Sequence, residues 1–267
     1  EIMPSLVGSE MCIRDSDYIT KPVSPSIALA RVKTHISLAH QMQTTENLVV
    51  ARTEELTRSQ QSAITMLATA GHYNDTDTGH HIWRMAAYSK CLAIASGWSY
   101  NDACLLAQAA PMHDTGKIGI PDSILKAPRR LTNSEMEVMR THAQIGHKIL
   151  SQCETPLFNL AAEIALCHHE KWNGTGYPEG LTGEEIPESA RIVAIADVFD
   201  ALTMQRPYKK AWTDDEAFAH LTNGAGDHFD PDLVDCFLSI KEEIIETKRY
   251  WNALEAEGSM ISIGSLL

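Results

Sequence analysis

Apolar residues recur at helical spacing over most of this chain, from about residue 66 to residue 250. Residues 105–112 form an apolar run that closes on His113. Residues 157–170 and 190–204 have the composition of two further buried helices. The pattern predicts a mainly α-helical domain over this part of the chain.

One helix start can be placed from side-chain chemistry. Thr132 and Glu135 stand three residues apart, as in a capping box, where each side chain binds the backbone N–H of the other residue. We expect a helix from this point through Leu150. Residues 173–187 are rich in glycine and proline and predict a loop, and the tail, residues 251–267, is weakly patterned.

A long connector helix is predicted before the domain, because residues 33–70 contain neither proline nor glycine. An apolar row recurs every seven residues at Met42, Val49, Leu56 and Ala63. The companion row that a helix-pairing seam needs is polar: Thr45, Arg52 and Ser59. Residues 41–65 therefore predict a helical linker that either forms a homodimer through this seam or remains solvated.

The N-terminal segments carry a different pattern. Residues 1–16 show neither helical nor strand periodicity, and we interpret them as an unassigned and foreign leader. Residues 17–40 resemble the last strand and helix of a response-regulator receiver domain, in which a lysine precedes a proline, here Lys21 and Pro22. The alternative is that these two residues merely end a strand. The resemblance includes no phospho-accepting aspartate, so phosphorylation is not predicted.

The charge balance limits the class of partner. Acidic residues outnumber basic residues by 35 to 22, which gives a formal net charge of -13. A broad basic surface for a nucleic-acid polymer is therefore excluded, since such binding depends on lysine and arginine neutralising phosphates. An anionic substrate would have to meet locally placed cations.

Cysteine usage and hydropathy bear on location. The six cysteines show no CxxC pair or regular spacing, so neither a disulfide framework nor a thiolate zinc site is indicated. No stretch approaches the roughly 18 apolar residues of a membrane span. The first residues of the sequence also lack the basic segment followed by an apolar segment that marks a signal peptide. We therefore expect a soluble, cytoplasmic protein that does not bind a membrane.

Several histidines stand next to acids or to one another, and with two aspartates they form a mixed nitrogen and oxygen ligand set: His81, His113, His142, His168, His169, Asp114 and Asp197. This set suits iron, manganese or zinc better than calcium, which prefers oxygen ligands alone. Asp77 and His81, four residues apart, would share one face of a helix. That spacing alone, like a single His-Asp pair, is weak evidence.

The surrounding sequence is more specific. Four segments resemble the HD superfamily, and in particular the HD-GYP phosphodiesterases: PMHDTGKIGIPD, ALCHHEKWNGTGYPEGLTGEEIP, ARIVAIADVFDALTMQRPYKKAW and GAGDHFDPDLVDCF. The second contains the Gly176-Tyr177-Pro178 triplet that gives the family its name. The resemblance spans about residues 66–240. It implies an HD-type helical bundle and a metal-dependent hydrolase that cleaves cyclic di-GMP to linear pGpG or GMP in bacterial signalling.

The resemblance also implies a ligand set. One metal ion would be held by His81, His113, Asp114 and Asp197. A second would be held by His142, His168 and His169, with Asp114 bridging the two ions. Asp77 occupies the position where some members place a glutamate for a third ion, and its side chain is one methylene shorter. We expect two divalent ions, iron or manganese, with a third as the alternative.

Four further residues match positions with other roles in the family. Lys117 stands one turn beyond Asp114 and would bind the nucleophile or a phosphate oxygen, which makes Lys117 and Asp114 the catalytic candidates. Tyr177, Arg206 and Lys209 would bind the substrate, the two cations through its phosphates. Apart from the resemblance, all four are ordinary surface residues.

Two rival functions stay open. The first is an HD phosphohydrolase for another nucleotide, such as a mixed cyclic dinucleotide, because sequence does not show the pocket contacts. The second is a non-catalytic sensor of cyclic di-GMP. Thr115 and Thr175 depart from the family pattern at positions that are not ligands, whereas Asp77 bears on the number of ions.

Overall fold

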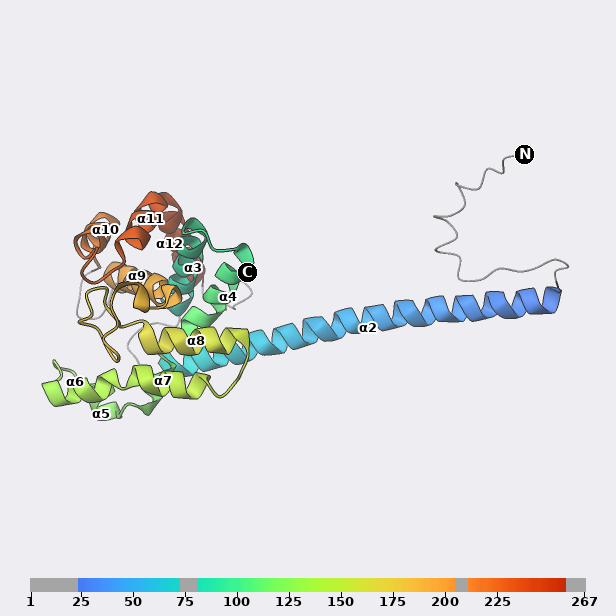
Figure 1. Ribbon diagram of the computed structural model, residues 1–267, viewed down its shortest axis with the longest axis horizontal. Helices are drawn as coiled ribbons and strands as arrows, with labels where there is room; N and C mark the ends of the chain where they lie inside the picture. The colour runs from blue at the N-terminus through green and yellow to red at the C-terminus, as the bar shows by residue number, and fades with distance from the viewer. Residues whose placement is uncertain (1–23, 73–80, 205–210, 258–267) are drawn as a thin grey trace. The chain divides into compact units, whose positions relative to one another are not determined.

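The computed structural model of the chain describes residues 24–72, 81–204 and 211–257 (Figure 1). It divides into two units, Glu1–Arg58 and Ser59–Leu267. Within the described ranges the chain forms helices and no β-strand, with isolated bridges at Asn173–Thr182 and Ala225–Phe229. The predicted mainly α-helical architecture is therefore confirmed.

The first described helix is α2 (Pro25–His72). The helices that follow it are α3 (His81–Ala95), α4 (Tyr100–Ala109), η1 (Ala110–Met112), η2 (Thr115–Gly119), α5 (Asp122–Leu125), α6 (Asn133–Arg140), α7 (His142–Leu150), α8 (Pro156–Cys167), η3 (Gly183–Glu185), α9 (Glu188–Thr203), α10 (Asp214–Asn223), α11 (Pro231–Ser239) and α12 (Lys241–Ala256). No described helix combines the length and the apolar content that crossing a lipid bilayer requires.

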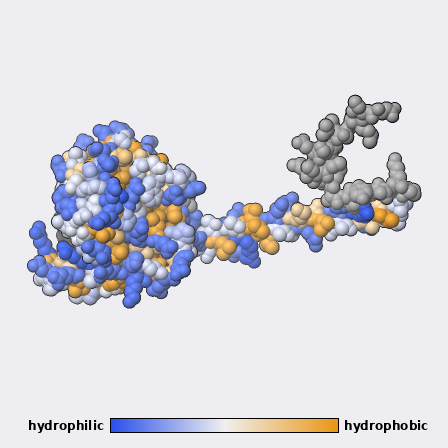
Figure 2. All heavy atoms as spheres, in the orientation of Figure 1, coloured by the Kyte–Doolittle hydropathy of each residue, from blue (hydrophilic) through white to orange (hydrophobic). Residues whose placement is uncertain are grey.

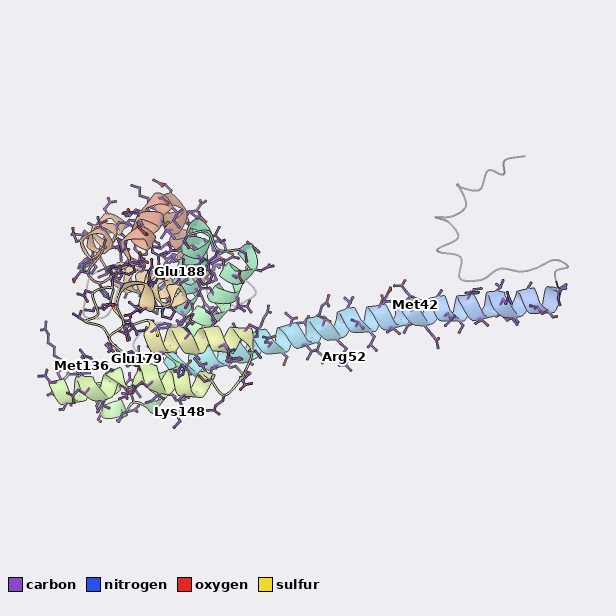
Figure 3. All side chains as sticks on the ribbon, in the orientation of Figure 1. Met42, Arg52, Met136, Lys148, Glu179 and Glu188 are labelled. Carbon is purple, nitrogen blue, oxygen red and sulfur yellow. The ribbon has the colours of Figure 1, made fainter. Side chains whose placement is uncertain are left out.

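The connector helix is confirmed as α2, which is 48 residues long. Its apolar row is exposed, with Met42 at 65% and Leu56 at 70% of their accessible surface (Figure 2). Figure 3 shows Met42 and Arg52 projecting from this helix. In its last turns Ile64 and Ala68 are buried and join the hydrophobic core of the second unit. The receiver-like Lys21 and Pro22 lie outside the described residues.

The core of the second unit is built around α3, which contacts α4, α9, α11 and α12. Most of its residues are buried, including the fully enclosed Met85, Tyr88 and Leu92. Phe199 of α9 meets Tyr88 edge to face with ring centres 5.5 Å apart. Because α3 is enclosed on several sides, its polar residues must also find partners inside the protein.

The predicted helices are observed with shifted ends. Residues 105–112 fall in α4 and η1, residues 157–167 in α8, and residues 190–203 in α9. Helix α8 ends at Cys167, so His168 and His169 begin the following loop. That loop includes residues 173–187, as predicted.

The prediction of one helix from Thr132 through Leu150 is correct at both ends but wrong in the middle, because the structure has two helices there. The capping box at Thr132 and Glu135 is present and starts α6. However, α6 ends at Arg140, because Thr141 turns its backbone N–H and its hydroxyl back to the carbonyl of Val138, at 3.1 and 2.6 Å. A second helix, α7, therefore starts at His142.

Helices α7 and α8 lie side by side (Figure 1), and η2 packs closely on α7. This contact requires a glycine. A Cβ atom on Gly116 would lie 1.9 Å from the carbonyl oxygen of His142 and 2.4 Å from the backbone nitrogen of Gly146. The HDTG segment can therefore approach the start of α7 closely, which brings Asp114 toward His142.

Candidate metal centre

The adjacent His113 and Asp114 lie between η1 and η2, and both are buried. The Nδ1 of His113 donates a hydrogen bond to the carbonyl of Ala110 at 2.9 Å, because a carbonyl can only accept. This fixes the proton on Nδ1 and leaves Nε2 as a lone-pair donor. His113 Nε2 lies 3.1 Å from Asp114 Oδ2.

His142 and His168 are held in the same way. Their Nδ1 atoms donate to main-chain carbonyls, His142 to Met139 at 2.8 Å and His168 to Ile164 at 3.0 Å. Their Nε2 atoms are buried and have no hydrogen-bond partner among the described residues. Buried polar atoms are normally satisfied, so two such nitrogens facing one carboxylate fit the ligands of a metal cation.

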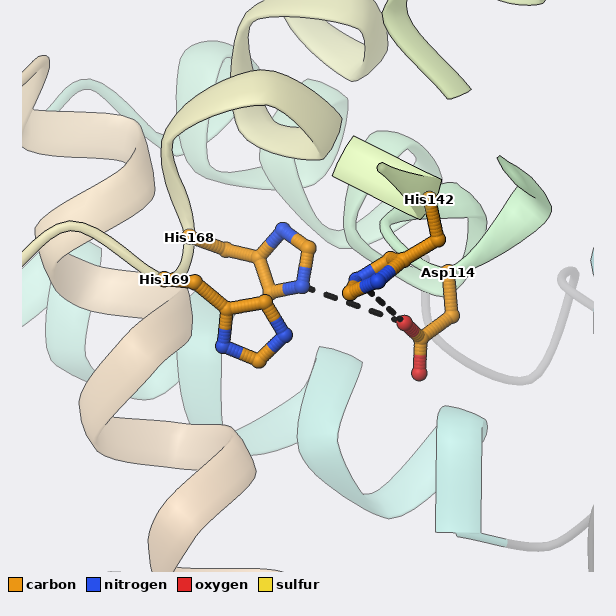
Figure 4. Close-up of side chains that lie close together, drawn as sticks. All are labelled: Asp114, His142, His168 and His169. Carbon is orange, nitrogen blue, oxygen red and sulfur yellow. Dashed lines mark ion pairs between the residues drawn. The ribbon is translucent and has the colours of Figure 1, made fainter. Parts of the chain in front are cut away.

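These residues form the first of two ligand groups, which we name the Asp114 group: Asp114, His142, His168 and His169 (Figure 4). One ligand atom from each lies within 4.8 Å of the others. Asp114 Oδ1 is 3.4 Å from His142 Nε2 and 3.9 Å from His168 Nε2. The rings of His168 and His169 are tilted against each other with centres 4.0 Å apart.

The second group, which we name the His81 group, contains His81, His113 and Asp197. His81 is the first residue of α3, and Asp197 lies on α9. His81 Nε2 lies 3.3 Å from Asp197 Oδ1. The two groups adjoin because His113 is followed directly by Asp114, whose two oxygens face different histidines.

The electrostatics of the Asp114 group favour neutral imidazoles. Burial is the largest influence on the pKa values of His142, His168 and His169, and it lowers all three, to about 3 for His169. Neutral imidazole is the form that binds a metal ion. These three nitrogens are therefore ready to coordinate at neutral pH.

The His81 group is more strongly charged. Burial has the largest single effect on the pKa of His81 and lowers it, but the hydrogen bonds and charges of Asp197 and Asp200 together raise it to about 10. Burial likewise raises the pKa of Asp197, but the His81 hydrogen bond and the charges of His113 and His81 outweigh it and hold this pKa below the usual range. Without a metal ion, His81 is therefore protonated at neutral pH.

Two residues behind His81 were missed by sequence reasoning. Asp200 Oδ2 lies 2.6 Å from His81 Nδ1, and Arg84 binds the same carboxylate. A weak signal existed, because Asp200 follows Asp197 by three residues and Arg84 follows His81 by three. Residues three apart share a helix face.

Lys117 lies where the sequence placed it, beside Asp114. Its Nζ is 2.7 Å from Asp114 Oδ2, and its side chain is mostly buried. The ammonium group adds a positive charge beside the Asp114 group, whose three histidines are neutral. This position suits an interaction with an anionic group, and the catalytic role of Lys117 stays a prediction.

Tyr177 also lies beside the centre. Its ring stacks on His169 with centres 4.7 Å apart, and its backbone N–H donates to the carbonyl of His169 at 3.2 Å. The loop that carries it is fixed by Glu170, a buried residue that sequence reasoning missed. The Glu170 carboxylate accepts hydrogen bonds from the backbone N–H groups of Glu179, Gly180 and Leu181.

The Gly176-Tyr177-Pro178 turn approaches the end of α8 at Gly176. A Cβ atom there would lie 2.4 Å from the Cα of Glu170 and from the backbone nitrogen of Lys171. Only glycine fits this contact. The chain can therefore double back and place Tyr177 on the ring of His169.

The described residues thus bring together the seven expected ligands in two adjoining groups, with Lys117 and Tyr177 beside them. Three expected site residues, Asp77, Arg206 and Lys209, lie outside the described residues. The assigned roles of all these residues stay predictions.

Comparison with known proteins gives a family match. The model of the HD domain family matches residues 43–233. A probable cyclic di-GMP phosphodiesterase of Vibrio cholerae serotype O1 is 40% identical over 268 residues, covering 92% of this chain and 60% of the relative. The cyclic di-GMP phosphodiesterase response regulator RpfG of Xanthomonas campestris pv. campestris is 41% identical over 229 residues, covering 83% and 61%. This chain therefore spans about three fifths of the length of either relative.

A solved structure supports the fold. The cyclic GMP-AMP specific phosphodiesterase V-cGAP3 of V. cholerae aligns with a TM-score of 0.55 at 20% identity. The alignment covers 73% of this chain and 50% of that chain. The likeness confirms the predicted HD-type helical fold. The receiver-domain remnant at residues 17–40 stays a prediction.

Proposed function

Because the chain belongs to the HD domain family and its described ligands form two groups that meet at Asp114, we propose that it is a metal-dependent phosphodiesterase acting on cyclic di-GMP. The observation that carries the proposal is the position of the Asp114 carboxylate. One oxygen lies 3.1 Å from His113 of the His81 group, and the other lies 3.4 Å from His142 of the Asp114 group. A carboxylate placed in this way is suited to bridge two ions.

The donor set supports divalent iron or manganese as the metal. Imidazole nitrogens and carboxylate oxygens suit these ions, and no described cysteine belongs to either group. Two such ions, when bound, supply an activated water as nucleophile and stabilise charge on the phosphoryl oxygens. We propose two ions, with a third if Asp77 contributes.

The protein's own groups would orient the substrate. Lys117 places its ammonium 2.7 Å from Asp114, where it can donate to a phosphate oxygen and stabilise developing negative charge. Tyr177 offers an aromatic ring and a phenol at the same edge, suited to a guanine base or a phosphate. On the family resemblance alone, we assign Arg206 and Lys209 to binding the phosphates of the substrate. These cations would supply local positive charge in a chain whose formal net charge is -13.

The substrate is proposed from the relatives, two of which are named for cyclic di-GMP. Hydrolysis would give linear pGpG, GMP or both. The test is to purify the chain without air, load it with manganese or iron, and identify the products from cyclic di-GMP and from a mixed cyclic dinucleotide. Turnover of the mixed dinucleotide alone would establish the first rival function, and tight binding without product would establish the sensor.

A matched pair of histidine variants makes this test specific. His142 and His147 both lie on α7 and both donate Nδ1 to a main-chain carbonyl, but only His142 belongs to the Asp114 group. His142→Ala should abolish hydrolysis and reduce bound metal, whereas His147→Ala should retain both. Equal loss in the two variants would contradict a metal site at His142.

We also propose a homodimer through α2. The exposed row at Met42, Val49 and Leu56 is costly to leave in water, and a second copy of the same helix could cover it. Light scattering of wild type and Val49→Glu tests this, with loss of the dimer expected in the variant. A monomeric wild type would leave α2 as a solvated linker. A receiver remnant at residues 17–40 and a cytoplasmic location complete the proposal.

A further inference from the structure

We infer that Asp200, Arg84 and Glu255 form a positioning chain that fixes the His81 imidazole for one metal ion and makes α12 part of the metal centre. The inference rests on the proposed function, since it concerns the ligands of the same centre. The three residues come from α9, α3 and α12. They were assigned no role by the sequence pattern, and α12 lies beyond residue 233, where the family match ends.

The first link sets the orientation of His81. Asp200 has no accessible surface and places Oδ2 at 2.6 Å from His81 Nδ1. A carboxylate accepts, so Nδ1 donates to Asp200, and Nε2 faces Asp197, 3.3 Å away, where it would coordinate once a metal ion displaces its proton. A partner behind a ligating histidine fixes both its tautomer and its ring orientation.

His81 has its Nδ1 partner on another helix. Three other histidines of the centre use carbonyls three or four residues earlier: His113 uses Ala110, His142 uses Met139 and His168 uses Ile164. At His81 the acceptor is a side chain instead, the Asp200 carboxylate of α9.

The second link holds Asp200. Arg84, with 2% of its surface exposed, donates from Nε to Oδ1 at 2.9 Å and from Nη2 to Oδ2 at 3.3 Å. This bidentate fork prevents the carboxylate from rotating away from His81. A buried ion pair gains little net stability, because removing two charges from water costs about as much as their attraction returns. The Arg84–Asp200 pair therefore adds little to the stability of the fold, and its main effect is to orient His81.

The third link reaches α12. Arg84 Nη1 donates to Glu255 Oε2 at 2.8 Å and to Asn252 Oδ1 at 3.3 Å. Trp251 of the same helix is buried in the core, which anchors this part of α12 against α3. The end of α12 therefore restrains Arg84, then Asp200, and through Asp200 the ring of His81.

The test uses the full chain loaded with manganese under anaerobic conditions. In Asp200→Asn, the side chain has only one oxygen. If this oxygen accepts from His81, the NH2 group faces Nε of Arg84, which is also a donor, so either the His81 bond or the Arg84 bond is lost. We expect metal affinity of the His81 group to fall about 10–100-fold, the effect typical of losing an outer partner of a ligand. Elemental analysis should then show about one ion fewer per chain, and the electron paramagnetic resonance of a coupled manganese pair should become that of isolated ions.

Asp230→Asn is the matched control. Asp230 is also a buried aspartate paired with an arginine, Arg191, but it caps α11 and belongs to neither ligand group. This variant should bind metal as wild type does. Glu255→Gln provides a milder variant at a partly exposed position that should not disturb folding, with a fall in affinity of up to about tenfold.

Wild-type metal content and affinity in both Asp200→Asn and Glu255→Gln would overturn the inference. So would an equal loss of metal in Asp230→Asn. If Asp200→Asn does not fold, Glu255→Gln decides alone. A wild type that binds two ions without hydrolysing a cyclic dinucleotide would defeat the proposed function, and the metal affinities of the variants would still decide whether these residues position His81. A wild type that binds no ion would defeat both.

Discussion

Replacing Glu170 with glutamine tests how firmly the loop after α8 is held against the candidate metal ligands. In the native protein, Glu170 Oε1 accepts from Glu179 N at 2.7 Å and from Gly180 N at 3.1 Å, and Oε2 accepts from Leu181 N at 3.2 Å. Glutamine has a single carbonyl oxygen. If it keeps the first two bonds, its NH2 group, which is a donor, must face the N–H of Leu181.

The expected loss is one hydrogen bond to a charged acceptor in a buried place, about 1.5–3 kcal/mol of unfolding free energy. For a domain of this size, each kcal/mol lowers the melting temperature by about 2–4 °C, so the variant should melt about 3–12 °C below wild type. Glu170→Ala leaves all three N–H groups without the carboxylate and should lose more.

Thermal and urea unfolding of wild type and variant measure this difference. Glu163→Gln is the matched control, because Glu163 lies on α8 and accepts one hydrogen bond, from Ser189, at an exposed position. Its unfolding free energy should stay within about 0.5 kcal/mol of wild type. If Glu170→Gln unfolds like Glu163→Gln, the carboxylate does not hold the loop as argued.

The same variant should affect substrate binding. Loosening the loop allows Tyr177 to leave the ring of His169, on which it now stacks at 4.7 Å. We expect KM for the dinucleotide to rise while metal content stays at the wild-type level, since the ligating histidines precede Glu170. Loss of metal instead would mean that the carboxylate supports the ligands rather than the loop.

Three further outcomes follow from the geometry of the centre. Asp114→Ala should lose both ions and nearly all activity, because its two oxygens face different ligand groups, and wild-type metal content would contradict a bridging role. Lys117→Ala should keep its metal and turn over about 100-fold more slowly, since one donor to a developing charge is removed, and an unchanged rate would make Lys117 an ordinary surface residue. Metal binding to the His81 group should strengthen from pH 6 to pH 8, because the raised pKa of His81, about 10, requires the ion to displace a proton. Calorimetry in buffers of different ionisation enthalpy should show about one proton released at pH 7, and release of none would refute this.

Much of the helical framework could be predicted from the sequence, because apolar spacing and capping are local signals. The capping box at Thr132 and the long helix α2 are both observed. The break at Thr141 was not predicted, since threonine does not end helices by itself. In this protein its hydroxyl donates to the carbonyl of Val138. The close packing of η2 on α7, which Gly116 allows, fixes where α7 starts.

The candidate ligands stood out because histidine and aspartate are rarely gathered in apolar segments without a reason. The structure adds that their ligand atoms meet. Sequence reasoning could not supply Arg84, Asp200 or Glu170. Arg84 and Asp200 are 116 residues apart, and a charged residue predicted to lie on a helix gives no sign of burial unless its distant partner is known.

The two ligand groups differ in how their histidines are held, and this difference determines how each responds to its surroundings. His142 and His168 are fixed by carbonyls of the main chain and are neutral because they are buried, so neither a remote side chain nor a moderate change in pH alters them. His81 is fixed by a carboxylate that depends on Arg84 and, through it, on α12. We therefore expect the His81 group to lose a bound ion first when pH falls or when α12 is displaced. Because Asp114 belongs to both ligand groups, loss of that ion would remove the paired geometry on which the proposed hydrolysis depends.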